Sequence, residues 1–315
     1  MSVETTARAI KYEVAKAIAG QENAVEQALV AILANGHVLL EGVPGLAKTL
    51  LVRSLAQAFA LDYGRIQFTP DLMPSDVIGT NIFDPKSGDF KLRKGPIFVN
   101  VLLADEINRT PPKTQAALLE AMEERRATID GEPHQLPPPF LVFATQNPID
   151  FEGTYPLPEA QQDRFLLKVV LDYPPDQVEI EILRRHHGGF RPQNLDNAGI
   201  QPVVSSEQLR KLHEEVGRVG VEDKVFNYIY EVVRATRKSN DILFGGSPRA
   251  GIALLNCGKA LAALRGRDFV IPDDIKELAL PVLRHRVLLR PEAEVEGLTT
   301  DRVLTSLIEA QVVPR

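Results

Sequence analysis

Residues 37–49 read HVLLEGVPGLAKT, and this stretch decides the fold. A short apolar strand runs into a glycine-containing turn, then a lysine and a threonine, and a helical pattern follows. The backbone N–H groups of such a turn and of the helix N-terminus bind phosphate oxygens. We therefore predict a nucleotide site, in which Lys48 neutralises the terminal phosphates of ATP and Thr49 holds Mg²⁺ through its hydroxyl. On this motif alone, a strand-to-helix turn without a ligand stays open.

One position of the loop departs from the usual pattern, which has glycine immediately before the lysine. Here that residue is Ala47. Because a β-carbon disfavours positive φ, we expect Ala47 to have helical backbone angles with negative φ. The residues predicted to bind the nucleotide here are Gly42, Val43, Pro44, Gly45, Leu46, Ala47, Lys48, Thr49 and Leu50.

Two adjacent carboxylates end a second apolar run, Val101–Glu106. At a strand end beside the phosphate loop, Asp105 would order Mg²⁺ and its waters. Glu106, one residue further on, would polarise the water that attacks the γ-phosphate, a general-base role that distinguishes ATP hydrolases from nucleotide-binding kinases. A solvated strand end is the alternative for this pair alone. Its combination with the phosphate loop favours an ATPase.

Two more polar residues are candidates for the same reaction. Asn147 follows the apolar run Phe140–Thr145 and could orient the attacking water, although an Asn-Pro turn would also explain it. Arg164 precedes the run Phe165–Val170 and could reach the γ-phosphate of a neighbouring subunit, or be an ordinary surface arginine.

The chain is predicted to be α/β, because short apolar runs alternate with helical patterns from about residue 21 to 170. These runs lack polar alternation, which is typical of parallel strands buried on both faces. Two further segments, Asn81–Lys91 and Arg126–Glu132, have turn residues between β-prone runs and predict hairpins. The five predicted strands are His37–Glu41, Arg65–Phe68, Val99–Ala104, Phe140–Thr145 and Phe165–Val170.

The sequence pattern changes after the last predicted strand. Residues 186–206 are rich in glycine and proline and predict a connection, and apolar residues then recur at helical spacing to the end of the chain. We therefore expect an α/β core over residues 1–190, a linker over 191–205 and an all-helical domain over 206–315. The pair His186-His187 is interpreted as linker histidines rather than metal ligands.

In combination these motifs resemble the AAA+ ATPases, and within them the MoxR family, over roughly residues 18–289. The matching segments are Gly42–Thr49, Leu103–Lys113, Ala144–Pro148 and Gly246–Ala250. The resemblance implies an AAA+ P-loop core with a five-stranded parallel sheet in an αβα sandwich and a C-terminal helical lid. The hairpins would then be the helix-2 insert and the pre-sensor-1 hairpin, which tend to face the central pore of a ring.

The resemblance also implies roles for single residues. Asn147 is similar to the sensor-1 residue, Arg164 to the arginine finger that acts on a neighbouring subunit, and Arg249 to the sensor-2 arginine. Whether Arg249 acts in its own subunit or across an interface stays open. Gly20 and Gln21 resemble the segment beside the adenine. Arg109 could be a second interface arginine or pair with the helix that carries residues 120–124.

As a function, the resemblance implies Mg²⁺-dependent ATP hydrolysis between subunits of a ring, expected to be a hexamer. The ring would remodel, mature or load metal into client protein complexes, possibly with a partner that carries a von Willebrand factor A domain. Three alternatives stay open: a nucleic-acid-associated motor, a magnesium-chelatase-type motor subunit and a non-hydrolysing scaffold gated by nucleotide.

Composition narrows these classes. The 315 residues, of which 44% are hydrophobic and 25% charged, suffice for about two globular domains. The net charge of −6 disfavours a nucleic-acid partner. The single cysteine, Cys257, excludes an intrachain disulfide or a Cys-rich zinc site and is expected to serve packing. Because no segment predicts a signal peptide or a membrane span, we expect a cytoplasmic protein.

Overall fold

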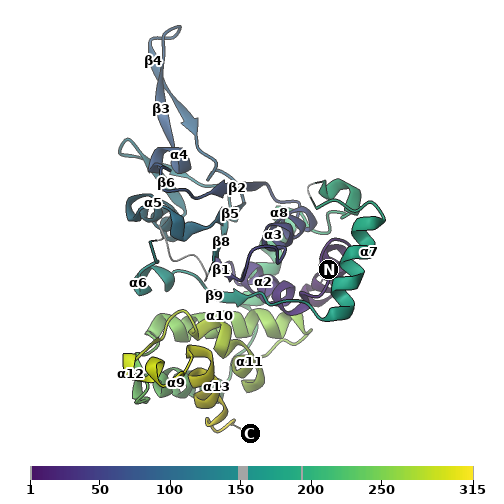
Figure 1. Ribbon diagram of the computed structural model, residues 1–315, viewed down its shortest axis with the longest axis vertical. Helices are drawn as coiled ribbons and strands as arrows, with labels where there is room; N and C mark the ends of the chain where they lie inside the picture. The colour runs from purple at the N-terminus through teal and green to yellow at the C-terminus, as the bar shows by residue number, and fades with distance from the viewer. Residues whose placement is uncertain (1, 148–154, 193, 315) are drawn as a thin grey trace.

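The computed structural model describes residues 2–147, 155–192 and 194–314 (Figure 1). Within these residues a parallel sheet of five strands forms the centre of the core, in the order β2-β5-β8-β1-β9. The five predicted strands are confirmed, with ends shifted by one or two residues. They are β1 (Val38–Glu41), β2 (Tyr63–Gln67), β5 (Val101–Asp105), β8 (Leu141–Gln146) and β9 (Leu167–Val170).

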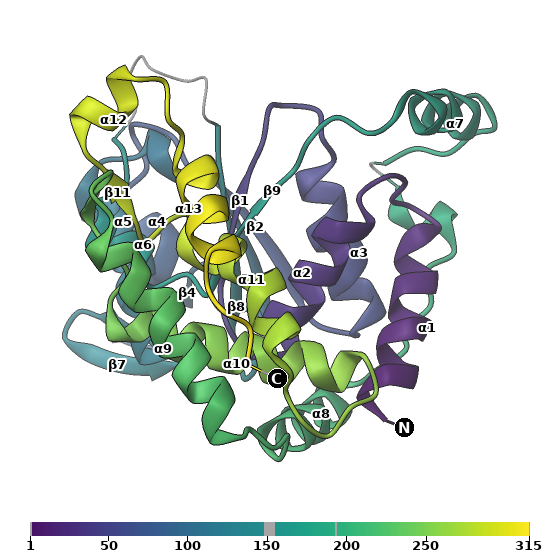
Figure 2. The same cartoon turned by 90° about the horizontal axis from the view of Figure 1, so that it is seen from below.

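Helices cover both faces of this sheet (Figures 1 and 2). Leu40, Leu103 and Phe143 point to the face covered by α1 (Val3–Ala15), α2 (Glu22–Leu33) and α3 (Lys48–Ala58). Leu39 and Leu102 point to the opposite face, which is covered by α4 (Pro74–Ile78) and α5 (Pro112–Glu124). Since both faces are apolar and buried at β1, β5 and β8, these three strands read as nearly continuous apolar runs, whereas the edge strands β2 and β9 include polar residues. The predicted αβα sandwich is therefore confirmed.

Both predicted hairpins are present. The first consists of β3 (Gly79–Asp84) and β4 (Asp89–Lys94) and projects far from the body of the molecule (Figure 1). The second consists of β6 (Arg126–Ile129) and β7 (Glu132–Gln135). Its turn residues, Asp130 and Gly131, have φ values of 52° and 85°. Positive φ at both positions is the geometry of a type I′ turn, for which an Asp-Gly pair is well suited.

The C-terminal helices pack beside β9, at the end of the sheet (Figure 1). The helical lid is thus confirmed, with a short antiparallel strand pair in addition. The elements after residue 205 are α8 (Ser206–Gly217), α9 (Asp223–Lys238), β10 (Ile242–Phe244), α10 (Pro248–Leu264), α11 (Pro272–Leu283), β11 (Leu288–Leu289), α12 (Pro291–Val295) and α13 (Thr300–Glu309). Cys257 is fully buried in α10, and burial raises the pKa of its thiol to about 12.

The core and the lid share one apolar cluster, which runs from α1 through α10 to α13. Helix α8 connects them, since His213 Nε2 lies 2.8 Å from the carbonyl oxygen of Ile32 in α2.

The remaining elements are the short helices α6 (Glu159–Gln162), η1 (Ile107–Arg109) and η2 (Leu195–Ala198), and α7 (Asp176–His187). His186 and His187 therefore end a helix, where we expected linker residues. No helix of the described segments is long and apolar enough to cross a membrane.

A buried histidine joins the layers of the core. His37 precedes β1 and is 5% exposed. Its Nδ1 accepts a hydrogen bond from the N–H of Val142 at 3.0 Å, and Nε2 donates to the carbonyl of Met122 at 3.1 Å. Burial, with the charge of Arg125 as a smaller cause, lowers the pKa of His37 to about 3. The fold therefore requires the neutral ring.

This requirement predicts acid sensitivity. The unfolded chain protonates His37 below its ordinary pKa of about 6.5, whereas the folded chain stays neutral down to about pH 3. The His37 contribution to the free energy of unfolding is thus complete above pH 6.5 and falls by about 1.4 kcal/mol per pH unit below it. Denaturant unfolding between pH 6.5 and 5 should show a shallower pH dependence for His37→Gln than for the native chain. The exposed His187→Gln is the control, and an equal slope in all three proteins would contradict the assignment.

Candidate functional site

The carboxyl ends of β1, β5 and β8 meet at one edge of the sheet and open into a cavity of about 620 Å³. Six predicted loop residues line it: Pro44, Gly45, Ala47, Lys48, Thr49 and Leu50. Asp105, Glu106 and Asn147 line it as well. Residues from three strand ends are thus brought together as the sequence predicts. The residue after Asn147 lies outside the described residues, so the alternative of an Asn-Pro turn is not tested.

The other predicted loop residues do not line the cavity. Leu46 is buried, and the carbonyl oxygens of Gly42 and Val43 accept hydrogen bonds from Lys48 Nζ. The ammonium group thus rests on the loop itself. Burial lowers the pKa of Lys48, and the carboxylates of Asp105, Glu106 and Glu41 oppose that shift.

The prediction for Ala47 is wrong. Its φ is 60° and its ψ is 22°, in the left-handed region, and it is the N-cap of α3. Gly45 also has a positive φ, of 93°. The loop reverses direction sharply before the helix. This turn requires a positive φ at position 47, although alanine prefers a negative one. A left-handed residue with a β-carbon costs about 1 kcal/mol relative to the ordinary conformation.

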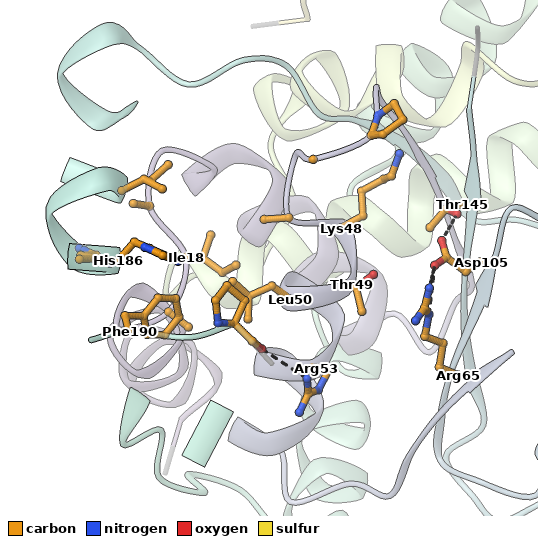
Figure 3. Close-up of a pocket in the computed structure, with 18 of the residues that line it drawn as sticks. Ile18, Lys48, Thr49, Leu50, Arg53, Arg65, Asp105, Thr145, His186 and Phe190 are labelled. Atoms are coloured by element: carbon orange, nitrogen blue, oxygen red, sulfur yellow. Dashed lines mark hydrogen bonds and ion pairs between the residues drawn. The ribbon is translucent and has the colours of Figure 1, made fainter. Parts of the chain in front are cut away.

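Both carboxylates are held by side chains that the sequence did not single out. Arg65 donates to Asp105 Oδ2 from Nη2 at 2.7 Å and from Nε at 3.1 Å (Figure 3). The hydroxyl of Thr145 donates to Asp105 Oδ1 at 2.6 Å. Gln67 Nε2 donates to Glu106 Oε2 at 2.7 Å, and Arg65 Nη2 donates to Gln67 Oε1 at 2.7 Å.

Arg65 and Gln67 belong to β2, which pairs with β5 so that they lie opposite Leu103 and Asp105. Two residues apart on one strand, they share a face of the sheet, and this brings them to the carboxylates. Only the order of the strands reveals that contact.

Arg109 was predicted either to act at a subunit interface or to pair with the helix that carries residues 120–124. In the structure its Nε lies 3.4 Å from Glu106 Oε2.

The opposite end of the cavity combines apolar and basic side chains. Ile18 and Phe190 line it, with His186 and Arg53 beside them (Figure 3). Gly20 and Gln21, predicted to flank the adenine, are not among its lining residues. Residues 17–19, immediately before them, take that place. Gly20 instead turns the chain with a φ of 72°, and Gln21 donates to the carbonyl of Asp172 at 2.9 Å.

The two predicted arginines lie elsewhere. Arg164 and Arg249 line a separate cavity of about 310 Å³, together with His37, which precedes β1 at the amino edge of the sheet. They meet at one carboxylate: Glu123 Oε2 lies 3.0 Å from Arg164 Nη2, and Glu123 Oε1 lies 3.1 Å from Arg249 Nη2. Arg164 also donates to the carbonyl of Leu119 at 2.6 Å.

Comparison with known proteins agrees with this architecture. The model of the AAA "ATPase family associated with various cellular activities" matches residues 37–167, and the AAA lid domain model matches residues 234–307. Chaperone MoxR1 of Mycobacterium tuberculosis is 44% identical, with 99% of this chain and 83% of the relative aligned. Protein YeaC of Bacillus subtilis is 47% identical, with 95% and 92% aligned. The chain belongs to the MoxR family of AAA ATPases.

More distant relatives and a solved structure extend the comparison. Protein MoxR of Methylorubrum extorquens is 30% identical, with 90% of this MoxR-family chain and 88% of the relative aligned. A crystal structure from Cytophaga hutchinsonii has 43% identity and a TM-score of 0.90, and the match covers 99% of this chain and 96% of that one. Membership in the MoxR family of AAA ATPases implies ATP binding.

The residues of the larger cavity fit Mg²⁺ and a nucleoside triphosphate. A hydroxyl and a carboxylate, those of Thr49 and Asp105, are oxygen donors, and Mg²⁺ in nucleotide sites takes its other ligands mainly from phosphates and water. Lys48 adds a positive charge beside them. At the other end Ile18 and Phe190 offer apolar surface to a flat base, so this cavity is the candidate ATP site of the MoxR-family chain.

The left-handed Ala47 gives a test of the loop geometry. Ala47→Gly should raise the free energy of unfolding by up to about 1 kcal/mol, because glycine adopts positive φ without the β-carbon penalty. Ala56→Gly, inside the same helix, should lower it by about 1 kcal/mol. Denaturant midpoints of both variants measure this. Equal destabilisation by the two variants would be evidence for an ordinary helical backbone at position 47.

Proposed function

We propose that this MoxR-family ATPase hydrolyses ATP with Mg²⁺ at sites shared between neighbouring subunits of a ring. One observation carries the proposal: the charged groups suited to this reaction lie in two separate cavities of one chain. Lys48, Asp105 and Glu106 line one, and Arg164 and Arg249 line the other. A head-to-tail ring would place the second cavity of one subunit against the first cavity of the next.

In the proposed reaction the loop and Lys48 bind the phosphates, and Asn147 orients the attacking water. Thr49 and Asp105 would hold Mg²⁺, which neutralises phosphate charge when bound. As the water oxygen bonds to the γ-phosphorus, the bond from the γ-phosphorus to the oxygen that bridges to the β-phosphate breaks, and Glu106 takes the water proton. Glu106 must first leave Gln67 and Arg109, which hold its carboxylate in the isolated chain.

The arginines would complete the site from the neighbour. Guanidinium groups stabilise charge that develops on a transferring phosphoryl group, and such a finger is worth about 10³ to 10⁵ in rate. In the isolated chain Glu123 binds both Arg164 and Arg249. Within the ring, a γ-phosphate would take the place of that carboxylate. A hexamer is the subunit number that we propose, by resemblance to the family.

The cellular role in this proposal is that of a chaperone. The relative MoxR1, 44% identical, is named a chaperone. We propose that hydrolysis drives remodelling, maturation or metal loading of client protein complexes in the cytoplasm, with a von Willebrand factor A domain protein as a partner. The projecting hairpin β3–β4, with Phe83 and Phe90 exposed and in edge-to-face contact at 5.5 Å, offers apolar surface for such a client.

Mixing of inactive variants tests the shared site. Glu106→Gln and Arg164→Ala should each lose at least about a hundredfold in ATP turnover, because each lacks one half of every site. A 1:1 mixture should recover about a quarter of native turnover, since about one interface in four then joins an intact Glu106 to an intact Arg164. Phosphate release measured above the concentration of assembly gives the result.

The matched control is a mixture of Glu106→Gln with Lys48→Ala. Both changes disable the same cavity, so this mixture should stay inactive. Arg210→Ala, which removes an exposed arginine paired only with its own helix, should keep native turnover. The shared site is refuted if Arg164→Ala alone stays active, or if its mixture with Glu106→Gln stays inactive while rings form.

A second mixture decides how Arg249 acts. Its position beside Arg164 predicts that both arginines serve the neighbouring subunit. Arg249→Ala should then recover turnover when mixed with Glu106→Gln, and should stay inactive when mixed with Arg164→Ala. Recovery in the mixture with Arg164→Ala would instead place Arg249 at the nucleotide of its own subunit.

A further inference from the structure

Glu106 has an unusual backbone conformation at the end of β5. Its φ is 57° and its ψ is 49°, in the left-handed region that a residue with a side chain rarely adopts. A side chain disfavours this conformation, so the surrounding structure has to hold it. It also turns the chain out of the sheet, because the β5–β8 pairing ends at Ala104 and Ala144. The N–H of Glu106 therefore needs a partner other than the backbone of β8.

That partner is a side chain of β8. The N–H of Glu106 donates to Thr145 Oγ1 at 2.8 Å. Thr145 is only 1% exposed and lies on the strand between β1 and β5, opposite Leu40 of β1. Its hydroxyl takes the place of the next bond of the parallel ladder.

The same hydroxyl also binds Asp105, and this fixes its direction. A backbone N–H can only donate, so Thr145 accepts from Glu106 and directs its single proton to Asp105 Oδ1, 2.6 Å away. The bond to a carboxylate is charge-assisted and short. One hydroxyl thus connects the two acidic residues of the site: it accepts a hydrogen bond from Glu106 and donates one to Asp105.

These bonds differ from those that hold the carboxylate of Glu106. Gln67 and Arg109 bind the carboxylate itself and must release it before it can take a proton from water. The bond from Thr145 is to the backbone of Glu106, so it can persist while the carboxylate changes partners. It is therefore suited to keep the base in place throughout the reaction.

We propose that Thr145 is a positioning residue for ATP hydrolysis: its hydroxyl holds the left-handed backbone of Glu106. Thr145 acts on the reaction through Glu106. The inference rests on the proposed hydrolysis with Glu106 as base. A role in positioning the base affects the rate of the chemical step and leaves binding of the nucleotide to the loop unchanged.

The test compares three variants of the full chain in its assembled form. Thr145→Val replaces the hydroxyl with a methyl group, Thr145→Ser keeps the hydroxyl, and Thr114→Val removes a buried hydroxyl outside the cavity. Thr114 is a matched control, because it is 2% exposed and its hydroxyl donates to the carbonyl of Leu72 at 2.8 Å. The measurements are kcat, KM, melting temperature and affinity for a fluorescent ADP analogue.

We expect Thr145→Val to lower kcat by about tenfold to a hundredfold, with KM and ADP affinity within about threefold of native. Thr145→Ser should restore most of kcat, and Thr114→Val should leave kcat unchanged even where its melting temperature falls. If Thr145→Val does not fold, Thr145→Ala is compared with Thr145→Ser instead, because these two variants differ by the hydroxyl alone.

Two results would overturn the inference. One is native kcat in Thr145→Val; the other is a loss in Thr145→Ser as large as in Thr145→Val, which would show that packing rather than the hydroxyl matters. The proposed function fails separately. If the native assembly does not hydrolyse ATP, or if Glu106→Gln retains native turnover, hydrolysis with Glu106 as base is wrong, whatever Thr145 does.

Discussion

The buried guanidinium of Arg286 holds the lid to the sheet, and the positions of the two candidate interface arginines depend on it. Its side chain is 4% exposed. It donates to the Asp163 carboxylate at 2.7 Å and to the carbonyl oxygens of Phe165 and Leu166 at 2.6 and 2.9 Å. Burying a charge costs several kcal/mol unless it is fully paired, and these acceptors supply that pairing. All of them lie in the segment that enters β9, immediately beside Arg164. Arg286 follows the lid helix α11, and α10, which carries Arg249, packs against α11. The pairing thereby fixes these lid helices against the turn that carries Arg164.

The candidate site depends on a second constraint, the parallel register of the sheet. Because β1, β5 and β8 run in the same direction, their carboxyl ends bring Lys48, Asp105 and Thr145 to one edge although they are far apart in sequence. The amino ends lie at the opposite edge, near the cavity that carries the arginines. A single subunit of this topology keeps the two sets of charges apart. In the proposed ring, a second copy brings them together.

Much of this was predictable from the sequence, wherever the signal was local. The phosphate loop is a contiguous strand, turn and helix, and the two carboxylates directly follow an apolar strand. Arg65 and Gln67 were not predictable in the same way, because their contact with Asp105 and Glu106 depends on β2 being the neighbour of β5. Ala47 has a positive φ although alanine disfavours it, because the loop as a whole sets this backbone angle. Gly20 and Gln21 were displaced from the cavity by a turn that the sequence does not specify.

The charged groups of the site share one property in the isolated chain. Each is bound to another group of the chain, whose place a phosphate or Mg²⁺ could take in the proposed complex. Carbonyl oxygens of the loop bind Lys48, where phosphate oxygens would bind it in the proposed complex. Arg65 binds Asp105 with a positive charge, as Mg²⁺ would, and Glu123 binds the arginines with a negative charge, as a γ-phosphate would. Leaving a buried charge unpaired is costly, and the exchange avoids that cost for the groups that act on the nucleotide. In this scheme nucleotide binding and ring formation give Lys48, Asp105 and the two arginines new partners, so these four groups stay paired throughout.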